Sequence, residues 1–467
     1  MNNRPRRLTD GPLTPALLRL AWPVFVSHAL YTLYGLADTI WVGRLSAEAL
    51  GAVSTSFFAS WALLAIGDLF IAGVTALVSQ AVGAERESEA SEVVGTAITL
   101  AFLAGVGVAA IGWFGARPLF GLLFDDAETI RMGAQYLSLY CLLAPAFYVS
   151  HVIDSLYRAS GDTHTPMLVL LVGTGLNIAL DPLLILGIGP FPRLEVQGAA
   201  LATIIGQMTA VSIYGVLYLR GHYPIPVRPE HLIRRFSGRR ARQIVQIGTP
   251  TALIGILFST VYLVLANFVG KFGAPALAAL GIVNRLESLN YLTANAMGMG
   301  VATLVGQNLG ARQVERAEAS ADRGALLITI TTGGMTVLYL VCPEWIARLF
   351  TSDPAALEEA VVFLRIVALA QILMGWELVY GQAFTGAGDT MPPLYASIVT
   401  SVVRIPLAWW LAFHAGVGLV SIWWIISITG ILRGIWVSAW FKLGRWKTRG
   451  IRFDEAGLAA TKTTTAR

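Results

Sequence analysis

Charged residues are scarce in this chain. Only 13% of its 467 residues are Asp, Glu, Lys or Arg, whereas 55% are hydrophobic and the mean hydropathy is +0.66. Soluble domains carry about 25% charged residues. Patterns of short alternating strands are missing too, and apolar runs of roughly 20 residues, enough for a helix to cross about 30 Å of hydrocarbon, recur instead. We therefore expect an all-α integral membrane protein.

Cysteine and catalytic motifs are equally sparse. The two cysteines, Cys141 and Cys342, lie in or near apolar segments, so we expect them to pack there without forming a disulfide. The chain has no Walker A motif, no Gly-x-Ser-x-Gly elbow, no His-Glu-x-x-His and no Cys-x-x-Cys. ATP-driven transport by this chain, an enzyme activity and a bound cofactor are therefore not expected.

Acids are nearly absent from one central segment. Between Leu219 and Gln243 a single acid, Glu230, accompanies seven arginines: Arg220, Arg228, Arg234, Arg235, Arg239, Arg240 and Arg242. A nucleic-acid patch is one interpretation of such a run. A cytoplasmic loop that obeys the positive-inside rule is favoured, so we expect no nucleic-acid partner.

The chain is rich in internal repetition. One constant distance along the sequence, which we call the repeat spacing, joins these matching pairs: Pro23 and Pro250, Val42-Gly43 and Val269-Gly270, Gln80 and Gln307, Gly83-Ala84 and Gly310-Ala311, Gly161-Asp162-Thr163 and Gly388-Asp389-Thr390. The repeat spacing holds without a net gap from Pro23 to Thr163. A duplicated unit in a hydrophobic chain predicts a transporter whose pathway runs between two like halves.

Twelve membrane-spanning helices are predicted, six in each half. They cover residues 15–43, 50–82, 93–116, 131–157, 166–189, 197–219, 243–270, 276–308, 323–343, 358–383, 393–414 and 417–441. The predicted parts are an N-terminal lobe (1–219), a basic cytoplasmic linker (220–242), a C-terminal lobe (243–441) and a cytoplasmic tail (442–467). Six spans per half make the halves parallel repeats. Because Lys and Arg gather in the loops of one side, both termini are expected in the cytoplasm of a cell-membrane protein.

Two acids, an amide and a hydroxyl share one depth in the N-terminal lobe. At 1.5 Å per residue, Asp38 lies about 7 Å from the outer end of its helix, Asp181 about 12 Å and Thr203 about 9 Å. Asn177 is one turn from Asp181 on the same face. These hard oxygen ligands suit a small cation, or the two acids share a proton. The alternative is that each acid merely pairs with a nearby donor.

The repeat makes this set asymmetric. By the repeat spacing, the counterparts of Asp38, Asp181 and Asn177 are Leu265, Ala408 and Arg404. Symmetric packing cannot require that difference, so we expect a specialised N-terminal lobe.

Other residues inside the spans have two interpretations each. Glu377 either binds a cationic substrate in a central cavity or pairs with Arg404. Asp68 is a packing or a pathway residue. Pro23 either lets the first helix bend in the transport cycle or is an inert kink. A spacing of four residues predicts an ion-pair ladder at Asp154, Arg158 and Asp162.

Four motifs of the chain stand out: Ala37-Asp38-Thr39-Ile40-Trp41-Val42-Gly43-Arg44-Leu45-Ser46 after Pro23, Val305-Gly306-Gln307-Asn308-Leu309-Gly310-Ala311, Arg158-Ala159-Ser160-Gly161-Asp162-Thr163 and Thr385-Gly386-Ala387-Gly388-Asp389-Thr390. They resemble signatures of the multidrug and toxic compound extrusion (MATE) transporters. The resemblance covers nearly the whole chain. It implies two six-helix bundles facing each other in a V around a central cavity.

The resemblance also implies a site. In the DinF-like members, the aspartates of helices 1 and 5 match Asp38 and Asp181, an asparagine and a threonine match Asn177 and Thr203, and the bend of helix 1 matches Pro23. The NorM-like branch places acids in helices 7 and 10. Here the predicted span 243–270 has no acid, and Glu377 of span 358–383 is not clearly aligned with the helix 10 acid of that branch, which favours the DinF-like branch.

A function follows from the same resemblance. We expect an antiporter, acting as a monomer in the lipid bilayer, that exports lipophilic or cationic drugs or metabolites in exchange for inward H⁺ or Na⁺. The alternative is a flippase or exporter of lipid-linked precursors or metabolites from the same superfamily. Such flippases often have extra spans, so twelve predicted spans argue against that alternative.

Overall fold

The computed structural model describes residues 7–227, 230 and 236–448, with the backbone alone for residues 47–64. Within these residues every regular element is a helix. The N-terminal half contains α1 (Leu13–Val42), α2 (Ala47–Gly83), α3 (Glu87–Leu123), α4 (Ala127–Leu142), α5 (Ala144–Ala159), α6 (His164–Leu186) and α7 (Val196–Leu219). The C-terminal half contains α9 (Gly238–Gly270), α10 (Ala274–Gly310), α11 (Val314–Val341), α12 (Pro343–Arg348), α13 (Pro354–Ala368), α14 (Gln371–Ala387), α15 (Met391–Phe413), α16 (Leu419–Lys442) and the 3₁₀ turn η1 (Arg445–Thr448).

The helices provide the predicted set of spans. In the described part of the chain, nine helices are long and apolar enough to cross a membrane. Two more spans are pairs of helices, α4 with α5 and α13 with α14, bent by 45° and 54°. The 37-residue α10 is also long enough, although polar residues such as Asn290 and Gln307 make it less apolar. α10 lies where the remaining span, residues 276–308, is predicted.

The two halves repeat each other's irregularities. α4 gives way to α5 at Leu143, and α13 gives way to α14 at residues 369–370, which is the same place once the repeat spacing is applied. Pro145 lacks an N–H for the helical ladder, which favours the first break, whereas α14 contains no proline. The predicted helices 131–157 and 358–383 are therefore each a span broken near its middle.

The predicted linker 220–242 is shorter than expected at its C-terminal end. α9 begins at Gly238, because the Ser237 side chain accepts a hydrogen bond from the Arg240 backbone N at 3.4 Å and caps the helix. The Arg240 guanidinium is buried and forms an ion pair with Glu89 of α3. One arginine of the basic run is thus an anchor between the two halves. α3 and α11 also begin earlier than predicted.

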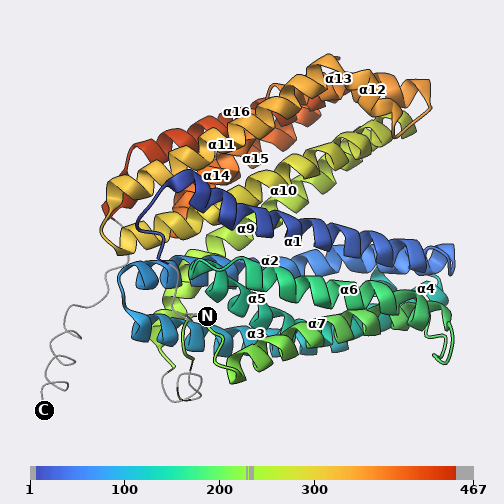
Figure 1. Cartoon of the computed structure of the whole chain (residues 1–467). Coiled ribbons are helices and arrows are strands. Elements are labelled where there is room, and N and C mark those ends of the chain that lie inside the picture. The colour runs from blue at the N-terminus through green and yellow to red at the C-terminus, as the bar shows by residue number, and fades with distance from the viewer. Residues whose placement is uncertain (1–6, 228–229, 231–235, 449–467) are drawn as a thin grey trace, which may run out of the picture.

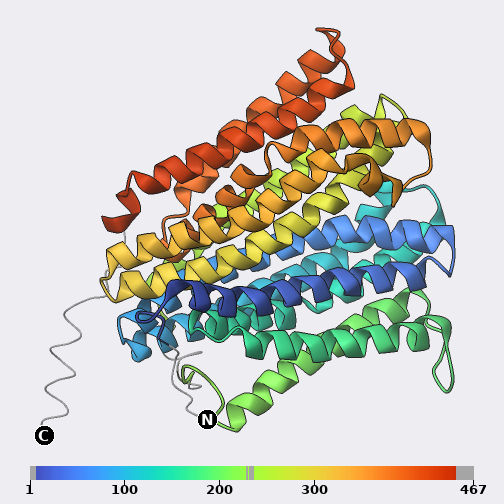
Figure 2. The same ribbon diagram turned by 45° about the horizontal axis from the view of Figure 1, so that its top comes forward.

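The halves lie closest together where α1 begins and α16 ends, and they diverge towards the opposite end (Figure 1, Figure 2). We call the first region the closed end. There, Gln80 of α2 donates a hydrogen bond to the Gly386 carbonyl of the other half, at 2.9 Å. Gln307 of α10 donates to the Ala159 carbonyl, also at 2.9 Å. The two hydrogen bonds are equivalent by the repeat spacing. The same type of contact therefore joins the two halves at two places.

Glycines permit this approach. A Cβ added to Gly83 would collide with the backbone of Gln307, and one added to Gly310 would collide with the backbone of Gln80. These two glycines are themselves related by the repeat spacing. The repeated Gln and Gly of the sequence therefore form one buried interface around the axis that relates the halves.

Candidate functional site

The four predicted site residues of the N-terminal half come together between α1, α6 and α7. Asp38 lies near the C-terminal end of α1, and Asn177 and Asp181 lie on α6. The Asn177 amide is 3.4 Å from Asp181 Oδ1 and 3.5 Å from Thr203 Oγ1, to both of which it donates. Asp38 is close enough to Asp181 to interact with it electrostatically. We call this set the acid cluster.

Three buried oxygens of the acid cluster lack a hydrogen-bond partner among the described residues. They are Asp38 Oδ1, Asn177 Oδ1 and Asp181 Oδ2, and their side chains are 7%, 3% and 0% exposed. A buried polar atom without a partner costs about 1–3 kcal/mol, and more when it is charged. A proton or a small cation that prefers oxygen ligands can satisfy such a set.

Two tyrosines that the sequence analysis missed belong to the same cluster. The Tyr34 hydroxyl is 2.9 Å from Thr203 Oγ1, and the Tyr136 hydroxyl donates to Asp38 Oδ2 at 3.4 Å. Tyr34 precedes Asp38 by one helical turn, so the spacing could have identified it. Tyr136 lies on α4, 98 residues from Asp38 in sequence, and no local pattern points to it.

Pro23 lies inside α1 and is buried. A proline leaves the carbonyl four residues before it without its helical N–H partner. That carbonyl, of Arg19, instead accepts a hydrogen bond from Thr163 Oγ1 at 3.4 Å. The equivalent threonine, Thr390, donates instead to the Ile247 carbonyl, three residues before Pro250, at 2.7 Å. Both Gly-Asp-Thr loops thus bond to the backbone just before a repeated proline.

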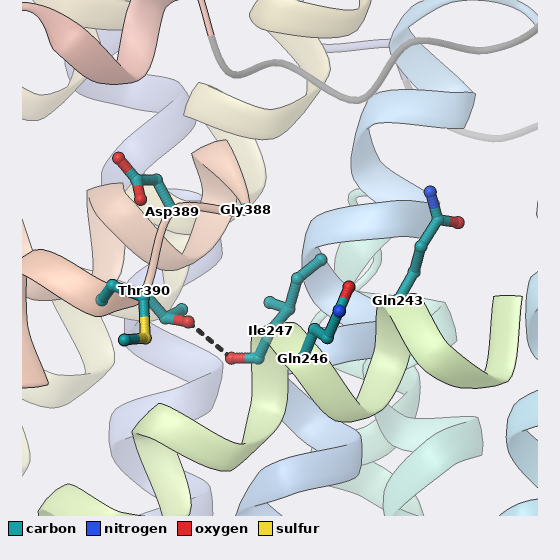
Figure 3. Close-up of a pocket in the computed structure, with 7 residues that line it drawn as sticks. Gln243, Gln246, Ile247, Gly388, Asp389 and Thr390 are labelled. Carbon is teal, nitrogen blue, oxygen red and sulfur yellow. Dashed lines mark hydrogen bonds between the residues drawn. The ribbon is translucent and has the colours of Figure 1, made fainter. Parts of the chain in front are cut away.

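A pocket of about 330 Å³ lies beside this second contact (Figure 3). It lies at the closed end, between the start of α9 and the Gly-Asp-Thr loop. Its lining residues are Gln243, Gln246, Ile247, Gly388, Asp389, Thr390 and Met391. None of the predicted ion or substrate residues is among them.

The two predicted substrate residues of the C-terminal half have separate partners. Glu377 forms an ion pair with Arg433 of α16, with 2.8 Å between Oε2 and Nε. Arg404 donates from Nε to Thr429 Oγ1 at 2.7 Å. The ion pair that the structure shows for Glu377 is with Arg433 and not with Arg404, because α16 brings a second arginine to that carboxylate. A carboxylate already paired with a guanidinium offers less charge to a cationic substrate.

The predicted ladder on α5 is half right. Arg158 and Asp154 form an ion pair at 3.8 Å. Asp162 instead caps α6, where its Oδ1 accepts hydrogen bonds from the backbone N–H groups of His164 and Thr165, both at 3.0 Å. Capping satisfies N–H groups that a helix start leaves free, and this outcome is typical of an aspartate after a glycine turn.

Two segments of the chain match the MatE family model, residues 23–183 and residues 250–410. They are separated by the repeat spacing. The chain belongs to the MATE transporter family.

Known proteins are similar to this chain over nearly their whole length. This MATE protein is 28% identical over 445 residues to the probable multidrug resistance protein NorM of Thermotoga maritima, with 93% of each chain covered. It is 28% identical over 433 residues to the FAD transporter of Shewanella oneidensis, with 92% of this chain and 94% of the relative covered. A solved structure of a MATE protein in the bent conformation has a TM-score of 0.86 with it, at 22% identity and 98% coverage of both chains.

These likenesses confirm three predictions. The chain is a multi-pass membrane protein of the MATE family, it has the fold of that family, and it is a transporter related to multidrug exporters, not an enzyme.

Proposed function

We propose that this MATE protein is an antiporter that exports lipophilic or cationic compounds while H⁺ or Na⁺ enters at the acid cluster. The observation that supports it is the set of three buried, unpartnered oxygens on Asp38, Asn177 and Asp181. Charges inside a membrane are expensive and are retained for function. The equivalent positions of Asp38 and Asp181 in the other lobe are apolar, so packing of the fold does not require them.

The orientation in the membrane follows from charge. Three arginines of the basic run, Arg239, Arg240 and Arg242, lie at the start of α9 at the closed end, where Arg240 forms an ion pair with Glu89. By the positive-inside rule this end, with both termini, lies in the cytoplasm. The two lobes, 1–219 and 243–441, then diverge towards the outside, and the conformation described is outward-facing.

The mechanism needs a link between the ion and the conformation. An ion shifts a conformational balance only through a difference in its affinity for the two states. The acid cluster joins α1 to α6 and α7, while the first turns of α1 pack on α10 of the other lobe at Gly300. α1 therefore connects the ion to the lobe interface, and Pro23, where a proline permits the helix to bend, lies between them. These N-lobe residues favour the DinF-like branch.

A metabolite or lipid-linked precursor exporter is the second candidate. The similarity to a protein named FAD transporter favours a metabolite among its possible substrates. In that case the coupling to an ion through the two lobes is the same, and only the exported compound differs.

The test is efflux of a fluorescent lipophilic cation from proteoliposomes, under an imposed proton gradient and, separately, under a sodium gradient. Efflux driven by one of the two gradients supports antiport and names the coupling ion. No response to either gradient, in protein shown by light scattering and thermal melting to be folded, contradicts drug–cation exchange and favours the second candidate.

A further inference from the structure

Asp68 is an exposed carboxylate deep inside a membrane-spanning helix. It lies on α2, about 22 Å from Gly83 at the closed end at 1.5 Å per residue. At such a depth a charge faces an aqueous cavity or a partner and not lipid. A Cβ added to Gly255 of α9 would lie 4.0 Å from Asp68 Oδ2, and Asp68 interacts electrostatically with Tyr291 of α10. The carboxylate therefore points between the two lobes.

Asp68 lies where the lobes begin to part. Gly248 and Gly255 are two helical turns apart on one face of α9. A Cβ on Gly248 would collide with the backbone of Leu69, whereas the nearest atom to a Cβ on Gly255 is the distant Asp68 oxygen. Further from the closed end, Phe258 and Tyr291 are 36% and 49% exposed. Asp68 is thus at the floor of the space that opens between α2, α9 and α10.

The repeat shows that this floor is filled on one side and open on the other. By the repeat spacing, His28 corresponds to Gly255 and Asp68 corresponds to Asn295. On the first side the His28 ring lies next to the Asn295 amide. On the second side there is a carboxylate in place of the amide, and a glycine in place of the ring. At this place the lobe interface therefore combines a carboxylate, Asp68, with a missing side chain, at Gly255.

The charge of Asp68 is not compensated by a neighbour. The acids Glu377 and Asp154 are paired with Arg433 and Arg158. Among the residues that the structure describes, no Lys, Arg or His forms an ion pair with Asp68. The rings of Tyr291 and Phe258 add aromatic surface, and aromatic faces attract organic cations.

We propose that Asp68, the space above Gly255 and the ring of Tyr291 form the recognition site for the positively charged group of the exported compound. This inference rests on the proposed export function and adds the residues that recognise the charged group of a cationic substrate, such as a quaternary ammonium or phosphonium. Asp68 is distinct from the acid cluster, whose residues lie on α1, α6 and α7. Cargo and coupling ion then have separate carboxylates.

The test is equilibrium binding of radiolabelled tetraphenylphosphonium to purified protein in detergent without any gradient. Asp68→Asn keeps the size of the side chain and reproduces its counterpart Asn295. We expect at least tenfold weaker binding of the cation and unchanged binding of an uncharged probe, N-phenyl-1-naphthylamine. Asp125→Asn, in the exposed loop between α3 and α4, is the matched control and should bind both as the wild type does.

A second variant tests the space instead of the charge. Gly255→Leu fills the place above Gly255 and leaves Asp68 intact, and it too should weaken tetraphenylphosphonium binding. Unchanged cation binding in both variants overturns the proposal, as does an equal loss of charged and uncharged probes in Asp68→Asn. Either result leaves the export function standing if the wild type pumps in proteoliposomes. A wild type that neither binds nor transports the cation refutes the export proposal first.

Discussion

A carboxylate held inside a membrane span costs stability, so removing its charge separates folding from function. In Asp38→Asn or Asp181→Asn, we expect a melting temperature equal to or above that of the wild type and no gradient-driven efflux. Melting in detergent and efflux from proteoliposomes measure the two effects. Asp125→Asn, outside the spans, should leave both unchanged. A folded Asp38→Asn that still pumps against a gradient would contradict ion entry at the acid cluster.

Single residues differ in how far their roles can be predicted from sequence. Asp38, Asn177 and Asp181 stand out because polar groups are rare in apolar spans and because helical spacing aligns the last two. Tyr136 does not stand out, since its contact with Asp38 depends on how α4 packs on α1. The ion pair of Glu377 with Arg433 could not be predicted either, because it depends on how α16 packs on α14.

At the scale of elements, hydrophobic length predicts where spans lie but not how they bend. The break before α5 coincides with Pro145, whereas the equivalent break before α14 has no proline. At that second break the Gln371 side chain donates to the Val367 carbonyl at 3.2 Å. The repeat spacing, not the local sequence, was the feature that could have predicted this break.

The two amide contacts of the closed end should set the balance between conformations. A buried hydrogen bond contributes about 1 kcal/mol net, so replacing both Gln80 and Gln307 by Leu shifts that balance by about 2 kcal/mol, roughly thirtyfold, towards a form open at this end. Spin labels at Ser88→Cys and Glu315→Cys, two exposed positions related by the repeat, measure the separation by electron paramagnetic resonance. We expect a new population at longer distance.

The control for this experiment is Gln135→Leu, whose amide oxygen accepts a hydrogen bond from Arg131, an exposed residue of the same helix, at 3.3 Å. It should leave the distance distribution unchanged. If the double variant gives the same distribution as the control, the crossing hydrogen bonds do not hold the lobes together.

For the whole molecule, duplication and charge bias predict the two lobes and the side of the termini, but not the conformation. Which end is closed depends on contacts between helices far apart in the chain, such as Gln307 with Ala159, and both states of a transporter must be compatible with one sequence. The unequal distribution of acids between the halves, by contrast, is visible in the sequence, because each acid in one half can be compared with its counterpart in the other.

The outward-facing assignment predicts chemical accessibility. In a protein without native cysteines (Cys141→Ala, Cys342→Ser), Tyr291→Cys should react with a membrane-impermeant maleimide from the outside, since Tyr291 is exposed between the diverging lobes. Ser88→Cys, at the closed end, should react only from the cytoplasmic side and so reports orientation. Ser79 lies on α2, and its side chain is fully buried against Gly306 of α10. Ser79→Cys should therefore become reactive only when the closed end opens. Labelling of Tyr291→Cys from the cytoplasmic side alone would mean that the resting protein opens inward. The conformation described here, closed at this end, would then be a transient state of the cycle.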